Sequence, residues 1–275
     1  MRRTVALILA LLLALLCFAG CGKREEKVLR VGMECAYAPY NWAQPTDANG
    51  AVPIKDSKDF AYGYDVMMAK FLADKIGYKL EIHMMDWDSL PIAVQSDVID
   101  CAIAGQSITE SRKETLNFTT PYYYASIVCL VRADGPFASA KGLSDLAGAT
   151  GTSQLSTVWY EDCLPQVPNV NILPGMESAP LMLVALVSNA CNLVVTDMPT
   201  AMNAVAVYPE LKMLDFTGLP DGFQVSEEEI NIGISVNKNN TDLLDKLNGA
   251  LSGLTEGDFE RMMNDAIKVA PLSED

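Results

Sequence analysis

The segment SITESRKETLNF, residues 107–118, holds the clearest candidate for binding chemistry, an arginine that follows three hydroxyl side chains. The apolar run 98–104 predicts a buried strand ending at Gly105, and Thr109 can cap a short helix with Arg112 in its first turn. Because the helix macrodipole is positive at that end, a solvated cation there is unfavourable by roughly a few tenths of a kcal/mol. A bound carboxylate would satisfy both charges, so the segment indicates an anion site.

Further polar residues follow other predicted strands, at the edge where open α/β sheets bind their ligands. They are Glu34, Ser107, Ser153 and Asp197, in addition to Arg112. An arginine fork suits a carboxylate, hydroxyls and free amides suit its oxygens, and an acid suits an ammonium. This set indicates a zwitterion such as a free amino acid. Two alternatives remain open, since Asp197 also fits a helix cap and Glu34 a solvated edge carboxylate.

Patterns typical of catalysis or metal binding are weak in this chain. The single histidine, His83, lies in a predicted strand, where a structural role explains it. The sequence contains no Gly-x-Ser-x-Gly, His-Glu-x-x-His or phosphate-binding glycine motif. The run DANG at 47–50 resembles the start of a calcium loop but lacks the closing glutamate. We therefore expect no catalytic residue, no metal ion and no cofactor.

The candidate residues are placed by an alternation of strands and helices, which predicts parallel sheets. The expected helix 65–76 has its apolar residues on one face and Gly77 to stop it. Residues 41–60, rich in Pro, Gly, Asp and Asn, predict a long loop. Two alternating blocks indicate an α/β fold with two similar lobes. The other expected strands are 29–33, 79–84, 98–104, 127–131, 170–173, 193–196 and 227–236, and the other expected helices are 89–96, 154–162, 178–187, one from 199, 241–254 and 258–267.

The N-terminus predicts export. Two arginines precede an apolar run at 5–16, and small residues then lead to Cys21, which is typical of a secretory signal and similar to the lipobox of bacterial lipoproteins. A retained transmembrane anchor is the alternative, but it needs about 20 apolar residues. We expect residues 1–20 to be a signal peptide, Cys21 to carry lipid and 21–27 to be a tether. The protein would then be extracytoplasmic and anchored to the bacterial cell membrane.

Charge and cysteine content exclude other classes. The balance of 20 basic against 35 acidic residues, or −15, excludes nucleic acid as a partner, because that binding needs a basic footprint. Removing residues 1–20 gives 18 − 35 = −17. The cysteines after Cys21 are odd in number and lack Cys-x-x-Cys spacing, which argues against a disulfide framework or zinc site but leaves one disulfide open. They are Cys35, Cys101, Cys129, Cys163 and Cys191.

Five segments of the chain match a known family pattern. They are LRVGMECAYAPYNW (29–42), GYDVMMAKFLADKIG (63–77), WDSLPIAVQSDVIDCAIAGQSITESRKETLNFTTPYYYA (87–125), ATGTSQ (149–154) and VVTDMP (194–199). Together they resemble the amino-acid-binding class of extracellular solute-binding proteins, family 3, which serve ABC importers. The resemblance implies the periplasmic-binding-protein type II fold, with two doubly wound α/β lobes that close on a ligand. Its implied divisions are 28–126 with 228–275 for lobe 1, 127–227 for lobe 2, and hinges near 126–127 and 228–231.

The resemblance also implies roles for the residues that would hold the head group of an amino acid. Arg112 would pair with the α-carboxylate, and Asp197 would hold the α-ammonium. Further contacts to the head group would come from both lobes, through Gly105, Ser107, Thr152 and Ser153.

The side-chain pocket would have Tyr37 and Trp87 as its walls, and Glu34 stands where some members carry an acid for a basic side chain. The expected ligand is therefore an amino acid with a cationic or a neutral or aromatic side chain. The expected partner is an ABC transporter permease, with the protein itself a monomer. Two departures are Cys35 beside the pocket and the long segment 41–60, which could cover the cleft.

Two other functions stay open. Relatives on the same fold include cyclohexadienyl dehydratases, which act on prephenate or arogenate, and Glu34 is the obvious spare carboxyl for a general acid. The protein could instead be a ligand-sensing partner of a membrane receptor. The export pattern favours the importer function, so we expect a binding protein and not an enzyme.

Overall fold

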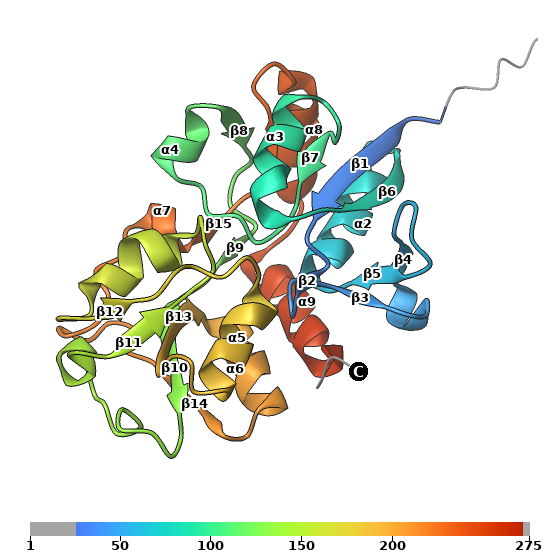
Figure 1. Cartoon of the computed structure of the whole chain (residues 1–275). Helices are drawn as coiled ribbons and strands as arrows, with labels where there is room; N and C mark the ends of the chain where they lie inside the picture. Colours follow the sequence, from blue (N-terminus) through green and yellow to red (C-terminus); the bar gives the residue numbers. More distant parts are fainter. Residues whose placement is uncertain (1–25, 272–275) are drawn as a thin grey trace, which may run out of the picture.

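The computed structural model describes residues 26–271 and builds them mainly around two five-stranded sheets. Figure 1 shows one sheet at the upper right and the other at the lower left, each with its own helices. This arrangement confirms the predicted α/β fold with two lobes. The expected signal peptide, Cys21 and most of the tether lie outside the described residues.

The first sheet combines strands from both ends of the chain. Its strand order is β6 (Lys79–Met84), β1 (Val28–Met33), β7 (Cys101–Ala102), β16 (Ser235–Asn237), β8 (Leu116–Phe118), and its helices are α2 (Tyr64–Ile76), α3 (Leu90–Gln95) and α8 (Thr241–Leu251). The first three strands run parallel, whereas β16 pairs antiparallel with both neighbours. The prediction of a parallel sheet was therefore wrong in part, because β16 enters the sheet from the opposite direction.

The second sheet is mixed for a similar reason. Its strand order is β12 (Asn171–Ile172), β11 (Thr150–Thr152), β13 (Leu193–Asp197), β10 (Ile127–Arg132), β14 (Leu211–Leu214), with α5 (Ala179–Val187) and α6 (Met198–Val207) as its α-helices. Strand β10 is antiparallel to both β13 and β14. The expected helix 154–162 is reduced to a π-helical turn, Trp159–Cys163, followed by a 3-10 turn, Leu164–Gln166. A further 3-10 turn is Leu143–Leu146.

Helix α2 shows how the apolar pattern fixes a local element. Val66, Ala69 and Ala73 are buried as the spacing predicts, and Leu72 between them is also buried. Gly77 ends the helix in the left-handed conformation at φ 72°, which glycine adopts without steric cost. Each large apolar side chain buried in this way stabilises the fold by roughly 1.5–3 kcal/mol.

The two lobes are connected through a small two-stranded sheet. Strand β9 (Tyr123–Tyr124) pairs antiparallel with β15 (Asn231–Ile232), and the chain passes between the lobes beside both strands (Figure 1). The expectation of an extended segment over 227–236 was wrong at its start, where α7 (Glu227–Ile230) forms a short helix. Ser226 and Glu229 close that helix with a capping box. Helix α9 (Glu256–Val269) ends the described chain.

The expectation of a long loop over 41–60 was wrong. Strands β2 (Ala36–Tyr37), β3 (Asn41–Gln44), β4 (Val52–Pro53) and β5 (Phe60–Tyr62) form a separate four-stranded sheet, with a 3-10 turn at Ala48–Gly50. Trp42 packs edge-on against Tyr62, with ring centres 5.4 Å apart. The Lys55 amide donates to the Ile82 carbonyl at 2.8 Å, so this small sheet extends the first lobe. Most of its polar residues and its glycine lie in the turns between the strands, which is why the composition of the segment predicts a loop.

Among residues 26–271, no helix is both long and apolar enough to cross a membrane. The same part of the chain holds its cysteines as buried free thiols, without a disulfide: Cys35, Cys101, Cys129, Cys163 and Cys191. Cys101 and Cys129 lie inside strands, where a thiol packs as a small apolar group.

Candidate ligand-binding site

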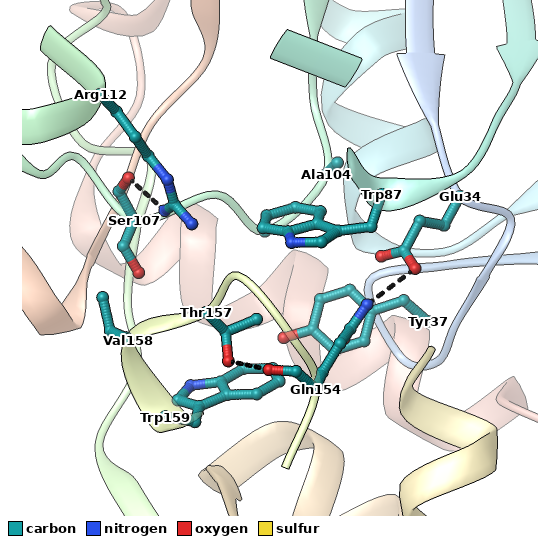
Figure 2. A pocket seen from close by; sticks show the side chains of 11 residues that line it. Glu34, Tyr37, Trp87, Ala104, Ser107, Arg112, Gln154, Thr157, Val158 and Trp159 are labelled. Atoms are coloured by element: carbon teal, nitrogen blue, oxygen red, sulfur yellow. Dashed lines mark hydrogen bonds between the residues drawn. The ribbon is translucent and has the colours of Figure 1, made fainter. Parts of the chain in front are cut away.

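A small cavity lies between the lobes, at the ends of strands from both sheets. Figure 2 shows its lining, which is Glu34, Tyr37, Trp87, Ala104, Gly105, Ser107, Arg112, Gln154, Thr157, Val158 and Trp159. Its volume is about 10 Å³, which is roughly the space that one water molecule needs. The six residues that sequence reasoning placed on the first lobe all line it. The three expected from the second lobe, Thr152, Ser153 and Asp197, do not.

Arg112 is positioned by the short helix α4 (Glu110–Lys113). The Thr109 hydroxyl accepts a hydrogen bond from the Arg112 amide at 3.2 Å, so Thr109 caps the helix as its position predicts. A helix of one turn aligns few peptide dipoles, and the dipole part of the sequence argument therefore carries little weight. What places the side chain toward the cavity is the cap and the turn.

The Arg112 guanidinium bridges the two lobes. It donates to the Ser107 carbonyl at 2.8 Å and to the Ser156 carbonyl of the second lobe at 2.9 Å. Its central carbon lies 5.4 Å from the Trp87 ring centre, a cation–π distance. Burial lowers the pKa of Arg112 to about 10, so the group stays charged near neutral pH. Within the described part of the chain it forms no salt bridge, and its charge is free to pair with an anion.

Glu34 supplies a buried acid at the other end of the cavity. It follows β1 directly and is only 8 % exposed. Gln154 of the second lobe donates to its Oε1 at 2.9 Å, a contact drawn in Figure 2. Burial raises the pKa of Glu34 to about 7, and the hydrogen bond from Gln154 opposes that shift only in part. A carboxyl in this state ionises more readily when a cation enters beside it.

Aromatic rings wall the space between the two charged groups. Trp87 opens a 3-10 turn, Trp87–Ser89, and donates to the Ser156 carbonyl at 3.3 Å. Tyr37 lies across the cavity from Trp87 (Figure 2). The ring centre of Tyr37 is 6.0 Å from the ring centre of Trp159. Flat apolar walls of this kind suit an aromatic ring, a methylene chain or a planar guanidinium.

Gly105 and Ser107 lie at the cavity but already have protein partners. The Gly105 amide donates to the Tyr122 hydroxyl at 3.2 Å, and that hydroxyl donates to the buried Asp65 carboxylate at 2.6 Å. The Ser107 hydroxyl donates to the Glu229 carbonyl at 3.3 Å, beside the connecting strands. These contacts link the cavity floor to the core and to the connection between the lobes.

The second-lobe candidates turn their side chains inward. Thr152 and Ser153 are fully buried, and their hydroxyls donate to the carbonyls of Pro174 at 2.9 Å and Val195 at 2.6 Å. Asp197 caps α6, since its Oδ1 accepts from the Thr200 amide at 2.8 Å. This is the alternative that the sequence left open for Asp197.

The other oxygen of Asp197 accepts a hydrogen bond from the Tyr37 hydroxyl, which comes from the first lobe. Burial raises the pKa of Asp197 to about 6, against the opposing effect of its hydrogen bonds. Asp197 therefore performs two functions in this structure, a helix cap and an interlobe contact.

Sequence reasoning missed the second-lobe residues that line the cavity. They are Gln154, Thr157, Val158 and Trp159, with Ala104 on the first lobe. Gln154 directly follows the candidates Thr152 and Ser153, and its position after a strand was the available signal. The Thr157 hydroxyl donates to the Gln154 carbonyl at 2.6 Å, which forms a tight turn and brings Trp159 to the cavity.

The charges of the site are arranged for binding a molecule with two different ends. Its charged groups are one cation and one acid at opposite ends, with aromatic rings between them. No cluster of three or more metal-ligating side chains occurs in the described residues. A molecule with a carboxylate at one end and hydrogen-bond donors at the other matches this distribution.

Comparison with known proteins places this chain in a family. The model of bacterial extracellular solute-binding proteins, family 3, matches residues 29–265. A probable histidine-binding protein of Neisseria gonorrhoeae is 28 % identical over 95 % of this chain and 94 % of its own length. An amino acid ABC transporter substrate-binding protein of Streptococcus pneumoniae bound to L-arginine has a TM-score of 0.75 and 26 % identity, covering 88 % of this chain and 94 % of that one.

A second similar structure is an ancestral amino acid-binding protein described as a precursor of cyclohexadienyl dehydratase. Its TM-score is 0.70 at 25 % identity, and it covers 87 % of this chain and 95 % of that one. The chain belongs to the bacterial extracellular solute-binding proteins, family 3. It is a binding protein of the kind that serves ABC transporters, and it is not an enzyme.

Proposed function

We propose that the protein captures a free amino acid between its lobes and delivers it to an ABC importer. The observation that carries this proposal is the partly buried Arg112 guanidinium, which lacks a carboxylate partner in the described chain and lies at the cavity. Arg112 binds the ligand α-carboxylate, with Gly105 and Ser107 beside it. Thr152 and Ser153 assist through their backbone amides, because their hydroxyls are engaged in the core. Asp197 binds the α-ammonium.

Closure is the mechanism, and it involves no covalent step. Lobe 1 comprises 28–126 and 228–275, lobe 2 comprises 127–227, and β9 with β15 acts as the hinge. The ligand favours the closed arrangement because only there does it contact both lobes at once. The interlobe contacts of Arg112 and Glu34 support this division.

A cationic side chain is the first candidate for what the pocket recognises. Glu34 is buried at the end of the cavity opposite Arg112, and its ionised form gains most from a positive partner. The L-arginine complex of the similar streptococcal protein supports this reading. A neutral or aromatic side chain is the second candidate, favoured by the walls formed by Tyr37, Trp87 and Trp159.

The protein acts outside the cytoplasm, and the lipid on Cys21 anchors it to the membrane as a monomer beside its permease. The N-terminal sequence pattern supports the anchor. The dehydratase alternative finds little support, since Glu34 is held by Gln154 and the similar ancestral protein is described as an amino acid-binding protein. A partner receptor in place of a permease would use the same closure.

Isothermal titration with the common amino acids tests the proposal. We expect at least one to bind with a 1:1 endpoint, and folded protein that binds none would refute the function. Arg112→Ala removes this cation and should weaken binding at least a hundredfold, since breaking an ion pair that the bound ligand buries costs about 3–5 kcal/mol. Arg261→Ala, at an exposed salt bridge on α9, is the matched control and should leave affinity unchanged.

A further inference from the structure

Asp197, the proposed partner of the ligand ammonium, is already engaged by a side chain from the opposite lobe. One oxygen accepts from the Thr200 amide at 2.8 Å within the second lobe. The other accepts from the Tyr37 hydroxyl of the first lobe. Asp197 is 1 % exposed and Tyr37 is 3 % exposed, so the contact is shielded from water.

A phenol hydroxyl and an ammonium can each donate a short, strong hydrogen bond to a carboxylate, through O–H and N–H respectively. Both partners of this contact are buried, and the cavity beside them has a volume of about 10 Å³. A free amino acid is several times larger than a water molecule. Its ammonium therefore reaches Asp197 only if the tyrosine hydroxyl leaves that oxygen.

We propose that the Tyr37 hydroxyl is an internal competitor for the ligand ammonium, which latches the lobes together in the absence of ligand and thereby sets the affinity. This inference rests on the proposed function for its effect on affinity, but the latch itself does not. A ligand can bind only after the lobes have opened. The apparent dissociation constant is therefore the intrinsic constant divided by the fraction of protein that is open.

The ring of Tyr37 is held independently of its hydroxyl. It stacks on Tyr40 with ring centres 4.6 Å apart and an angle of 10°. Gly105, at φ 61°, lies against the ring so closely that a Cβ there would come within 2.6 Å of it. Tyr37→Phe therefore removes the competitor and keeps the aromatic wall in place.

Tyr40 provides a matched control. It is fully buried beside Tyr37, and its hydroxyl has no hydrogen-bond partner among the described residues. Tyr40→Phe removes the same atom from the same aromatic stack and breaks no hydrogen bond to Asp197. Any effect common to both variants belongs to the loss of a buried hydroxyl, and only the difference between them reports on the latch.

Small-angle scattering of the protein without ligand tests the latch directly. We expect Tyr37→Phe to have a larger radius of gyration than the wild type, and Tyr40→Phe to match the wild type. Identical scattering from all three proteins, with unchanged thermal unfolding profiles, would overturn the latch. This measurement needs no ligand, so it remains decisive even if titration shows that the proposed function is wrong.

Titration with an amino acid that the wild type binds tests the competition. A hydrogen bond to a charged group is worth enough to change the affinity about tenfold, and we expect Tyr37→Phe to bind about tenfold more tightly. Tyr40→Phe should bind like the wild type. Weaker binding by Tyr37→Phe would show that the hydroxyl helps to hold the ligand and would overturn the competition.

Discussion

Glu34 offers a sharp test of what the pocket recognises, because its protonation state and its buried position make a quantitative prediction. The perturbation is Glu34→Gln, which keeps the size of the side chain and removes its charge. The ligands are arginine and citrulline, which share a head group and a chain length but differ in the charge of the side-chain end. Their affinity ratio isolates the side-chain end, because effects on Arg112 and Asp197 cancel.

The magnitude follows from the pKa of Glu34, which burial raises to about 7. A cationic ligand needs the ionised carboxylate, and the fraction that is ionised falls from roughly nine tenths at pH 8 to roughly one tenth at pH 6. The preference for arginine over citrulline should therefore drop about tenfold from pH 8 to pH 6. In Glu34→Gln the ratio should be small and flat with pH. Arginine itself should bind about 10–100-fold more weakly to the variant at pH 8, as expected for the loss of a hydrogen bond to a charged group.

Isothermal titration at pH 6, 7 and 8 measures all four combinations of protein and ligand. Arginine is the right cation because its guanidinium does not titrate in this range. A wild-type ratio that stays constant between pH 6 and 8 would refute the role of Glu34 as the acid that reads the side chain. A ratio that changes equally in Glu34→Gln would assign the titration to another group.

Three further predictions concern stability. Burial raises the pKa of Asp65 to about 6, so the folded state keeps this proton to a higher pH than the unfolded state does. Stability is therefore lost as pH rises from about 4 to about 7, and Glu34 and Asp197, whose pKa values burial also raises, add to the effect. The melting temperature without ligand should be higher at pH 5 than at pH 8. The opposite trend would contradict this prediction. Tyr122→Phe removes the 2.6 Å donor to that carboxylate and should cost about 1.5–3 kcal/mol in urea unfolding at pH 8, with a smaller loss at pH 5 where the acid is protonated. Gly63→Ala would place a Cβ 2.3 Å from the Tyr40 carbonyl oxygen at φ 128°, and it should lower the stability of the fold by about 2–4 kcal/mol in thermal unfolding. Gly77→Ala, at φ 72° with open space around the new Cβ, should lower it by about 1 kcal/mol. Equal losses from the two variants would contradict the steric argument.

Local patterns predicted much of the fold. The apolar face of α2 and the glycine after it set both the helix and its end, because side-chain spacing and left-handed backbone preference act within a few residues. The prediction for residues 41–60 was wrong because the structure there depends on contacts with distant residues. Its strands are short and pair with one another and with the first lobe, and such pairing depends on distant partners that composition does not reveal.

The site divides in the same way. The sequence by itself determined the chemical inventory, with Arg112 behind its Thr109 cap and Glu34 directly after the first strand, because residue type and strand end are local properties. Only the tertiary structure decided that Gln154 meets Glu34 across the lobes and that Tyr37 occupies Asp197. Those pairs are more than a hundred residues apart, and they meet because two separately folded sheets face each other across a hinge.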